Sequence, residues 1–178
     1  MCRYNSKNCS QICVNSEADY LPTFTLTVLR RMPARTSMVR PFIDSNVVLY
    51  LFSSDAFKAD CAESLLKSGG MVSVQVLNEV ASVCLRKLKM TWQDIDAVLL
   101  ALKSTCEVLP VTLVSHEKAI GLAQRYQLSL YDANIVSNAI LGGAKTLLSE
   151  DMQSGMLMDG VTVVNPFSNA GFASISAR

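Results

Sequence analysis

From residue 41 onward, short apolar runs alternate with longer stretches in which apolar residues recur at helical spacing. The apolar runs predict strands at about 41–44, 71–74, 106–109, 145–149 and 161–164. The periodic stretches predict helices over 56–67, 76–88, 95–102, 119–126 and 132–141. Val47 to Phe52 is interpreted as an apolar turn after the first strand. Because strands and helices alternate, we expect a three-layer α/β/α fold around a central parallel sheet of about five strands.

Glycines and short polar residues indicate where the helices begin and end. Gly69–Gly70 and Gly142–Gly143 each follow a helical stretch, a common position for glycine. Thr91 is a candidate N-cap for the helix that follows it. Ser115 is followed three positions later by Lys118 instead of glutamate, so it forms only half of a capping box for the next helix.

The first 37 residues differ from the rest, because they are rich in Ser, Asn, Thr and Arg and show no sustained period. Three interpretations stay open: a disordered leader, an artefact of an upstream start with Met38 as the true start, or a folded extension. Residues 38–167 are expected to form one folded domain. Residues 168–178 are expected to form a loose C-terminal tail.

The composition indicates a single domain without strong overall charge. The chain has 178 residues, half of them apolar, which is enough for one domain with a core. The net charge is +1, and residues 1–37 contribute five basic and two acidic groups, so they carry +3 and the remainder carries −2. A protein that binds nucleic acid by bulk charge is strongly basic. Any polyanion must therefore be held by a local basic patch and by bound metal.

The cysteines and the hydropathy indicate a cytoplasmic protein. The six cysteines include no C-x-x-C pair of the kind found in zinc or redox sites. Cys61, Cys84 and Cys106 lie among apolar residues, where a free thiol acts as a small core side chain. Reduced thiols fit a cytosolic location. The longest apolar runs fall far short of the roughly 20 residues that cross a bilayer, so no membrane span is expected.

Four acidic residues are the candidates for chemistry: Asp44, Glu79, Asp132 and Asp151. Three of them are placed just beyond a predicted strand, and Glu79 lies about one helical turn beyond the second strand. The carboxyl ends of parallel strands form the crevice in which open α/β sheets bind ligands. Carboxylates gathered there raise one another's pKa unless cations neutralise them. The pattern therefore predicts a divalent metal site.

Each acid also has an ordinary explanation. Asp44 and Asp132 are suitable helix N-caps. Glu79 lies off the apolar stripe of its helix and is expected to face solvent, and Asp151 belongs to the polar turn 149–151. No single residue decides between these alternatives, but the joint placement of all four favours a site.

Oxygen ligands select Mg²⁺ or Mn²⁺ over zinc. Two such ions clamp the attacking and leaving oxygens of a phosphoryl displacement. His116 is the single histidine and is expected at the surface, and no nucleophile motif such as G-x-S-x-G occurs. Metal-dependent hydrolysis is thus favoured over serine or cysteine chemistry.

Four segments in series also resemble a known family, the PIN domain, and in particular the VapC-type ribonuclease toxins of bacterial toxin–antitoxin pairs. The segments are Phe42–Asn46, Asn78–Glu79, Tyr131–Ala133 and Leu148–Asp151. The resemblance covers residues 40–167. It implies a PIN-like α/β/α fold, Mg²⁺- or Mn²⁺-dependent hydrolysis of RNA phosphodiester bonds, a homodimer, and inhibition by a cognate antitoxin.

By position, the resemblance assigns the metal-binding and catalytic roles to the four acids, Asp44, Glu79, Asp132 and Asp151. It assigns supporting roles to Asn46 and Ser149, which would orient those carboxylates or a water molecule. The leader before Met38 departs from the family pattern.

A basic cluster is the candidate RNA-binding surface. Arg86, Lys87 and Lys89 follow one another closely at the end of the helix that carries Glu79. Basic residues at a helix C-terminus also interact favourably with the helix dipole, so both interpretations stay open.

Two other functions compete with the ribonuclease. One is a non-catalytic α/β module that binds a protein partner. The other is a phosphatase of the haloacid dehalogenase type, in which Asp44 attacks phosphorus. That family needs a second aspartate two residues after the nucleophile, and this chain has Asn46 there.

Overall fold

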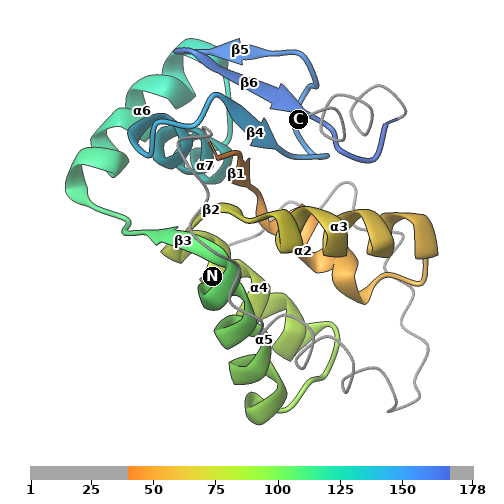
Figure 1. The fold of residues 1–178 in the computed structure, drawn as a ribbon. Coiled ribbons are helices and arrows are strands. Elements are labelled where there is room, and N and C mark those ends of the chain that lie inside the picture. The colour runs from red at the N-terminus through yellow and green to blue at the C-terminus, as the bar shows by residue number, and fades with distance from the viewer. Residues whose placement is uncertain (1–39, 169–178) are drawn as a thin grey trace.

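The computed structural model describes residues 40–168, so the 1–37 leader and all but the first residue of the 168–178 tail lie outside the described residues. The elements are, in chain order, β1 (Phe42–Ile43), α2 (Ser45–Leu49), the 3₁₀-helix η1 (Tyr50–Phe52), α3 (Ala56–Ser68), β2 (Gly70–Ser73), α4 (Val74–Arg86), α5 (Trp92–Thr105), β3 (Cys106–Leu109), α6 (Leu113–Tyr126), α7 (Leu130–Leu141), β4 (Thr146–Leu148), β5 (Leu157–Met158) and β6 (Val161–Val164) (Figure 1).

One six-stranded sheet has the strand order β3-β2-β1-β4-β6-β5. All neighbouring pairs are parallel except β5 with β6, which is antiparallel. The predicted α/β fold with a parallel sheet is confirmed. The number of strands was underestimated, because β5 has two residues and joins β6 through Asp159 and Gly160, which both have positive φ.

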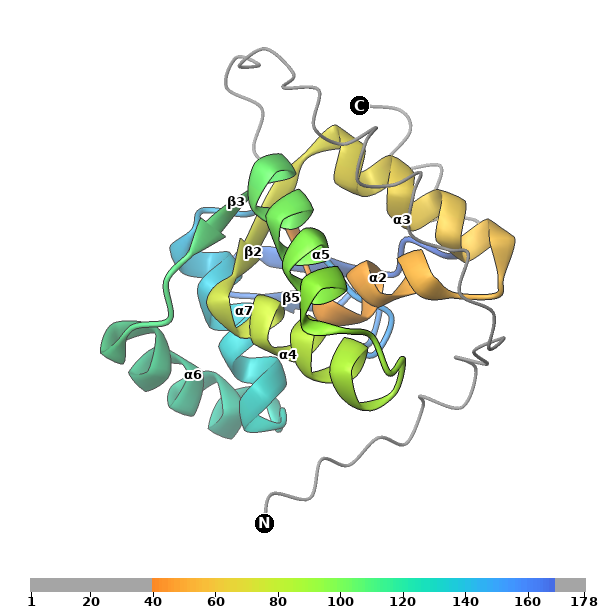
Figure 2. The same ribbon diagram turned by 90° about the horizontal axis from the view of Figure 1, so that it is seen from below.

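The helices form two groups (Figures 1 and 2). In one group, α6 packs on α7, and α7 contacts β2, β4 and β6. In the other, α2 contacts α3 and α4, and α5 contacts α3 and α4. The two groups cover opposite faces of the sheet, and strands that are covered on both faces have near-continuous apolar runs.

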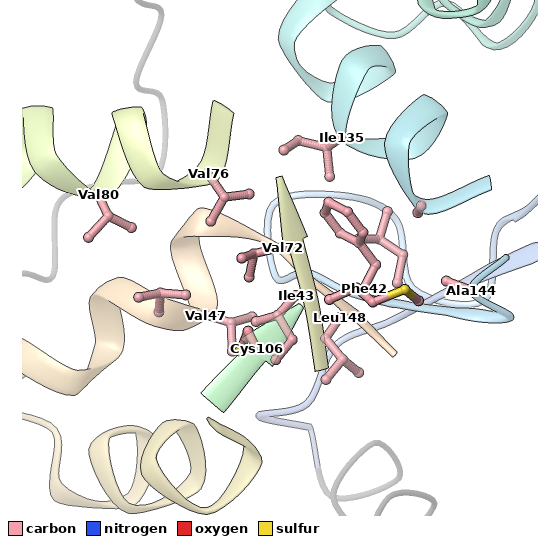
Figure 3. Packing of buried hydrophobic residues seen from close by; sticks show 14 of the residues in the cluster. Phe42, Ile43, Val47, Val72, Val76, Val80, Cys106, Ile135, Ala144 and Leu148 are labelled. Atoms are coloured by element: carbon pink, nitrogen blue, oxygen red, sulfur yellow. The ribbon is translucent and has the colours of Figure 1, made fainter. Parts of the chain in front are cut away.

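The central strand β1 shows this double burial directly. Its two residues, Phe42 and Ile43, are both fully buried although successive side chains of a strand point to opposite faces. Figure 3 shows Phe42 close to Ile135 of α7, and Ile43 close to Val47 of α2. The core thus lies on both sides of the sheet.

The structure corrects the prediction for residues 47–52. They form the last part of α2 and all of η1 instead of a turn. Val47, Val48 and Leu49 are all buried. A helix buried on all sides has no polar face, so the sequence carried no helical period to reveal it.

Of the two predicted N-caps, one is confirmed and one is wrong. Thr91 caps α5 as predicted, in a capping box with Asp94. The N-cap of α6 is Thr112, and Ser115 is the third helical residue whose side chain returns to Thr112, so its assignment as the N-cap was wrong. Exposed apolar residues in the first turn of α6, Leu113 and Val114, concealed this earlier start.

The prediction that Asp132 follows a strand was wrong. Helix α6 leads into α7 through residues 127–129, and no strand separates the two helices. Ser129 caps α7, and Asp132 is the third residue of that helix. Asp132 therefore reaches its position from a helix N-terminus.

The cysteine prediction is confirmed for the described residues, since Cys61, Cys84 and Cys106 are free and buried. Within residues 40–168, no helix is both long enough and apolar enough to cross a membrane.

Candidate active site

The site begins where the chain order of the strands reverses. From β1 the chain passes to β2 and β3 on one side, and later to β4 and β6 on the other. The carboxyl ends of the strands at such a switch point form the usual ligand crevice of open α/β sheets. Asp44 follows β1 directly, and its backbone N–H donates to Leu148 O of β4 at 3.0 Å. Asp44 and Ser149 are therefore neighbours across the switch point.

Asp44 is held by donors at both carboxylate oxygens. It is the N-cap of α2, and Oδ1 accepts from the backbone N–H of Ser45 at 2.7 Å. Oδ2 accepts from Ser149 Oγ at 2.8 Å and from Asn46 Nδ2 at 2.9 Å. The side chain thus accepts a hydrogen bond from the N-terminus of α2 and another from the loop after β4.

Burial raises the pKa of Asp44 from 3.8 to about 7. The Ser149 hydroxyl and the Ser45 N–H lower this pKa, whereas the charges of Glu79 and Asp151 raise it. Burial is the largest of these causes, because it removes water from the charged form. The fold thus holds a carboxylate that is costly to ionise without a cation beside it.

Asn46 and Ser149, the predicted supporting residues, link the two strand ends. Asn46 Nδ2 lies 3.1 Å from Ser149 Oγ, and Asn46 Oδ1 accepts from the backbone N–H of Glu150 at 3.3 Å. Ser149 is fully buried. These contacts fix Asp44 and the 149–151 loop relative to each other.

Glu79 approaches the same place from α4. Its Oε2 accepts from Ser45 Oγ at 2.6 Å, and its Oε1 accepts from Gln75 Nε2 at 2.9 Å. Gln75 Nε2 also donates to the backbone oxygen of Tyr131 in the first turn of α7, at 3.2 Å. Gln75 thus connects the helix of Glu79 to the helix of Asp132.

Asp132 and Asp151 complete the group. Asp132 is partly buried, and its Oδ2 accepts from Ser129 Oγ at 2.8 Å. Burial raises the pKa of Asp132, the Ser129 hydroxyl lowers it, and the charge of Asp151 raises it again. The exposed Asp151 therefore acts electrostatically on both Asp44 and Asp132.

The structure thus links the four acids through two sets of electrostatic interactions that share Asp151. Asp44 senses Glu79 and Asp151, and Asp132 senses Asp151. In the part of the chain from 40 to 168, no three His, Cys, Asp or Glu side chains are close enough to enclose an ion as they stand.

This arrangement fits an open magnesium-type site. All the donors are carboxylate, hydroxyl or amide oxygens, which Mg²⁺ and Mn²⁺ prefer. Magnesium usually keeps several waters and takes only one or two carboxylates together with substrate phosphate. A cation at Asp44 would also lower the cost of ionising that buried carboxyl. Asp44 with Glu79 or Asp151 would hold it.

The predicted RNA-binding residues lie at the far end of α4. Arg86, Lys87 and Lys89 are all exposed. Arg86 follows Glu79 by seven residues, or two turns of helix, which places it about 10 Å further along the same face. His116 is exposed on α6, as expected.

Sequence reasoning missed several residues that shape the site. Gln75 precedes Glu79 by four residues, a spacing at which helical side chains meet. Ser129 precedes Asp132 by three, which is the spacing of an N-cap with its third helical residue. Both signals were present in the sequence. Ser45, which joins Asp44 to Glu79, has no comparable local signal.

Comparison with protein families matches residues 42–153, well over half of the chain, to the PIN domain. Among solved structures, a toxin–antitoxin complex from Klebsiella pneumoniae is similar with a TM-score of 0.56 and 22% identity, over 71% of this chain and 97% of that chain. The Mycobacterium tuberculosis toxin VapC20, which cleaves the sarcin–ricin loop, is similar with a TM-score of 0.50 and 20% identity, over 60% of this chain and 85% of that chain. At these identities the likeness shows a common fold. A comparison with curated proteins found no significant match.

The matched range contains the four acids Asp44, Glu79, Asp132 and Asp151. It also contains β1 and β4, the strands that meet at the switch point described above. The resemblance predicted from the sequence is confirmed, and the chain belongs to the PIN domain family.

Proposed function

We propose that this protein is a Mg²⁺- or Mn²⁺-dependent endoribonuclease that hydrolyses RNA phosphodiester bonds. The observation that carries the proposal is Asp44, a buried carboxyl at the switch point whose pKa is raised to about 7 and which senses two further carboxylates. A structural N-cap needs neither the burial nor the additional acids.

In this proposal each residue has a defined task. Asp44 is the central ligand, oriented by Ser149 and Asn46. Glu79, Asp132 and Asp151 supply the remaining negative charge, and Asp151 is exposed, so substrate can approach from its side. When bound, a divalent cation would neutralise charge on the phosphate and make a water molecule more acidic.

We propose that RNA is held partly by Arg86, Lys87 and Lys89. Phosphate contacts by Lys and Arg give affinity without sequence preference. We also propose an antitoxin as protein partner and a toxin as the cellular role, supported by the toxin–antitoxin complex and the toxin named above. A cytoplasmic location stays a prediction. A homodimer stays a prediction, which the molar mass in solution will test.

The activity is tested by incubating a mixed-sequence RNA with the protein in Mn²⁺. The wild-type protein is expected to cleave, and Asp44→Asn to lose cleavage while keeping its circular dichroism spectrum. Asp96→Asn, a change at an exposed aspartate of α5, is the matched control and should cleave normally. Full cleavage by Asp44→Asn, or by wild type in excess EDTA, would refute the proposal.

The phosphatase alternative finds no support at the residue it depends on. Asn46 occupies the position of the general acid, and its amide donates to Asp44. Hydrolysis of a small phosphate monoester in the same assay would favour that alternative.

A further inference from the structure

A half-buried lysine that is not among the predicted site residues lies close to the 149–151 loop. Lys58 is on α3, and its side chain is 16% exposed. Its Nζ lies 2.7 Å from Glu150 Oε1 and 3.0 Å from the Tyr50 hydroxyl oxygen. The ammonium also lies over two aromatic rings, 4.3 Å from the centroid of Tyr50 and 5.4 Å from that of Phe167.

These contacts join four segments, two near residue 50 and two about a hundred residues later. Tyr50 belongs to η1, Lys58 to α3, Glu150 to the loop after β4, and Phe167 to the residues after β6. The Tyr50 hydroxyl donates to Glu150 Oε2, and the rings of Tyr50 and Phe167 meet edge to face at 4.6 Å. A cation that is partly shielded from water and placed on aromatic faces interacts more strongly than a fully exposed one. We call Tyr50, Lys58, Glu150 and Phe167 the lysine clasp.

The clasp is connected to the acidic site by covalent and hydrogen bonds. Glu150 lies between Ser149, which donates to Asp44, and Asp151. The backbone N–H of Glu150 donates to Asn46, whose amide donates to Asp44. The side chain of Glu150 points to Lys58 instead of to the carboxylates. The direction of the 149–151 loop is thus set from both sides.

We propose that Lys58 is a positioning residue of the acidic site, which holds Glu150 and thereby fixes the loop that carries Ser149 and Asp151. This inference deepens the proposed function and rests on it. Lys58 itself has no place in the chemistry, because its ammonium is directed at Glu150 and Tyr50.

Two simpler roles predict different results. If Lys58 acted only by its charge, removing it would strengthen binding of a divalent cation, since like charges repel. If it only stabilised the fold, removing it would lower the melting temperature and leave cation affinity of the folded protein unchanged. A positioning role predicts weaker cation binding in a protein that is still folded.

The test uses the whole chain and Lys58→Met, which keeps a long apolar side chain and removes the charge. Free Mn²⁺ is measured by electron paramagnetic resonance during a titration at neutral pH. Outer-shell changes commonly weaken metal binding by about 10–100-fold, so we expect the Mn²⁺ dissociation constant to rise at least about tenfold. We also expect kcat on RNA to fall while KM for RNA stays the same.

Lys67→Met is the matched control, because Lys67 is on the same helix and pairs with Glu63 at 2.7 Å in an exposed position. It should bind Mn²⁺ like wild type. Lys58→Arg keeps the charge and should recover most of the affinity.

Mn²⁺ binding by Lys58→Met that equals or exceeds that of wild type would overturn the inference. If Lys58→Met does not fold, Tyr50→Phe decides, since it keeps the ring and removes only the hydroxyl bound to Glu150 and Lys58. Unchanged Mn²⁺ affinity in Tyr50→Phe would then overturn the inference. Wild-type protein that neither binds Mn²⁺ nor cleaves RNA would instead refute the proposed function.

Discussion

Asp44 combines two demands that act against each other. As the N-cap of α2 it must present a carboxylate oxygen to the Ser45 N–H, and hydrogen bonds of this kind favour the charged form. Its position at the end of β1 buries the carboxyl beside the core, which disfavours the charged form. Burial is the larger effect, because the pKa of Asp44 rises to about 7. The metal-free protein therefore bears a cost that a bound cation would remove.

The raised pKa of Asp44 predicts that the stability of the folded protein depends on pH. Because the pKa of Asp44 is raised in the folded state, the folded protein binds more protons than the unfolded chain between pH 3.8 and about 7. The free energy of unfolding therefore falls as pH rises through that window and levels off above it. Between pH 5 and pH 7 this amounts to roughly 2 kcal/mol, since each pH unit contributes at most about 1.4 kcal/mol and the contribution shrinks as the pH approaches the pKa of the folded state. The raised pKa of Asp132 acts in the same direction.

Urea unfolding in EDTA at pH 5 and at pH 8 measures the effect. Wild type should be more stable at pH 5, and Asp44→Asn should lose most of the difference because asparagine does not titrate. Asp96→Asn should behave like wild type. An undiminished pH dependence in Asp44→Asn would contradict the raised pKa.

At the scale of elements, the site depends on how closely β2 approaches β1. Gly70 begins β2, and a Cβ at this position would lie 2.6 Å from Ile43 Cδ1 and 3.1 Å from Pro41 O. Ile43 is fully buried and precedes Asp44, so it has no free space into which to move. The absence of a side chain at residue 70 thus permits the packing that places Asp44.

Gly70→Ala is therefore expected to destabilise the protein by about 1–3 kcal/mol, the usual cost of overpacking a core. Gly121→Ala is the control, because a Cβ at Gly121 of α6 meets nothing within 4 Å. Alanine has the better helix propensity, so Gly121→Ala should stabilise by up to about 1 kcal/mol. Chemical denaturation of both variants gives the two values, and a neutral Gly70→Ala would show that β1 can shift.

Elements with a regular period were predictable, and those without one were not. The amphipathic helices and β2, β3, β4 and β6 were found within a few residues, because one side of each helix and each apolar run face the core. The buried helix α2 and the two-residue strand β5 carry no such signal. In the site, the placement of Asp44 and Asp151 after strands was predictable from topology. The contacts of Gln75 with Tyr131 and of Lys58 with Glu150 were not, because they join residues far apart in sequence.

At the scale of the molecule, the basic side chains fall into two groups, those that form ion pairs with carboxylates and those that do not. Within residues 40–168, five basic side chains form ion pairs: Arg40, Lys58, Lys67, Lys118 and Arg125. The other basic residues of this part form none, and they are Arg86, Lys87, Lys89, Lys103 and Lys145. Three of these five lie together at the end of α4, where α4 and α5 lie side by side (Figure 2). Arg86 donates to Ser82 Oγ within its own helix, but no carboxylate of the described residues neutralises the charge of the cluster, which is therefore available for phosphate.

If this cluster binds RNA, replacing all three residues with glutamine should weaken binding most at low salt. Each lost phosphate contact lowers the slope of log affinity against log salt by about 0.7 for single-stranded RNA, so the slope should become shallower by about 2. Binding is measured by fluorescence anisotropy with a labelled RNA, in the Asp44→Asn background so that the RNA stays intact.

Lys103→Gln is the control for Lys87→Gln, because neither lysine forms an ion pair with a described residue and both changes remove one positive charge. Lys103 lies near the end of α5, before the amino end of β3, and thus at the opposite edge of the sheet from the carboxyl-end crevice. Lys87→Gln should reduce the slope and Lys103→Gln should leave it unchanged. Equal changes in slope would mean that RNA affinity depends only on the total charge of the protein. A shallower slope for Lys87→Gln alone would place the phosphate contacts along α4, on the helix that also carries Glu79.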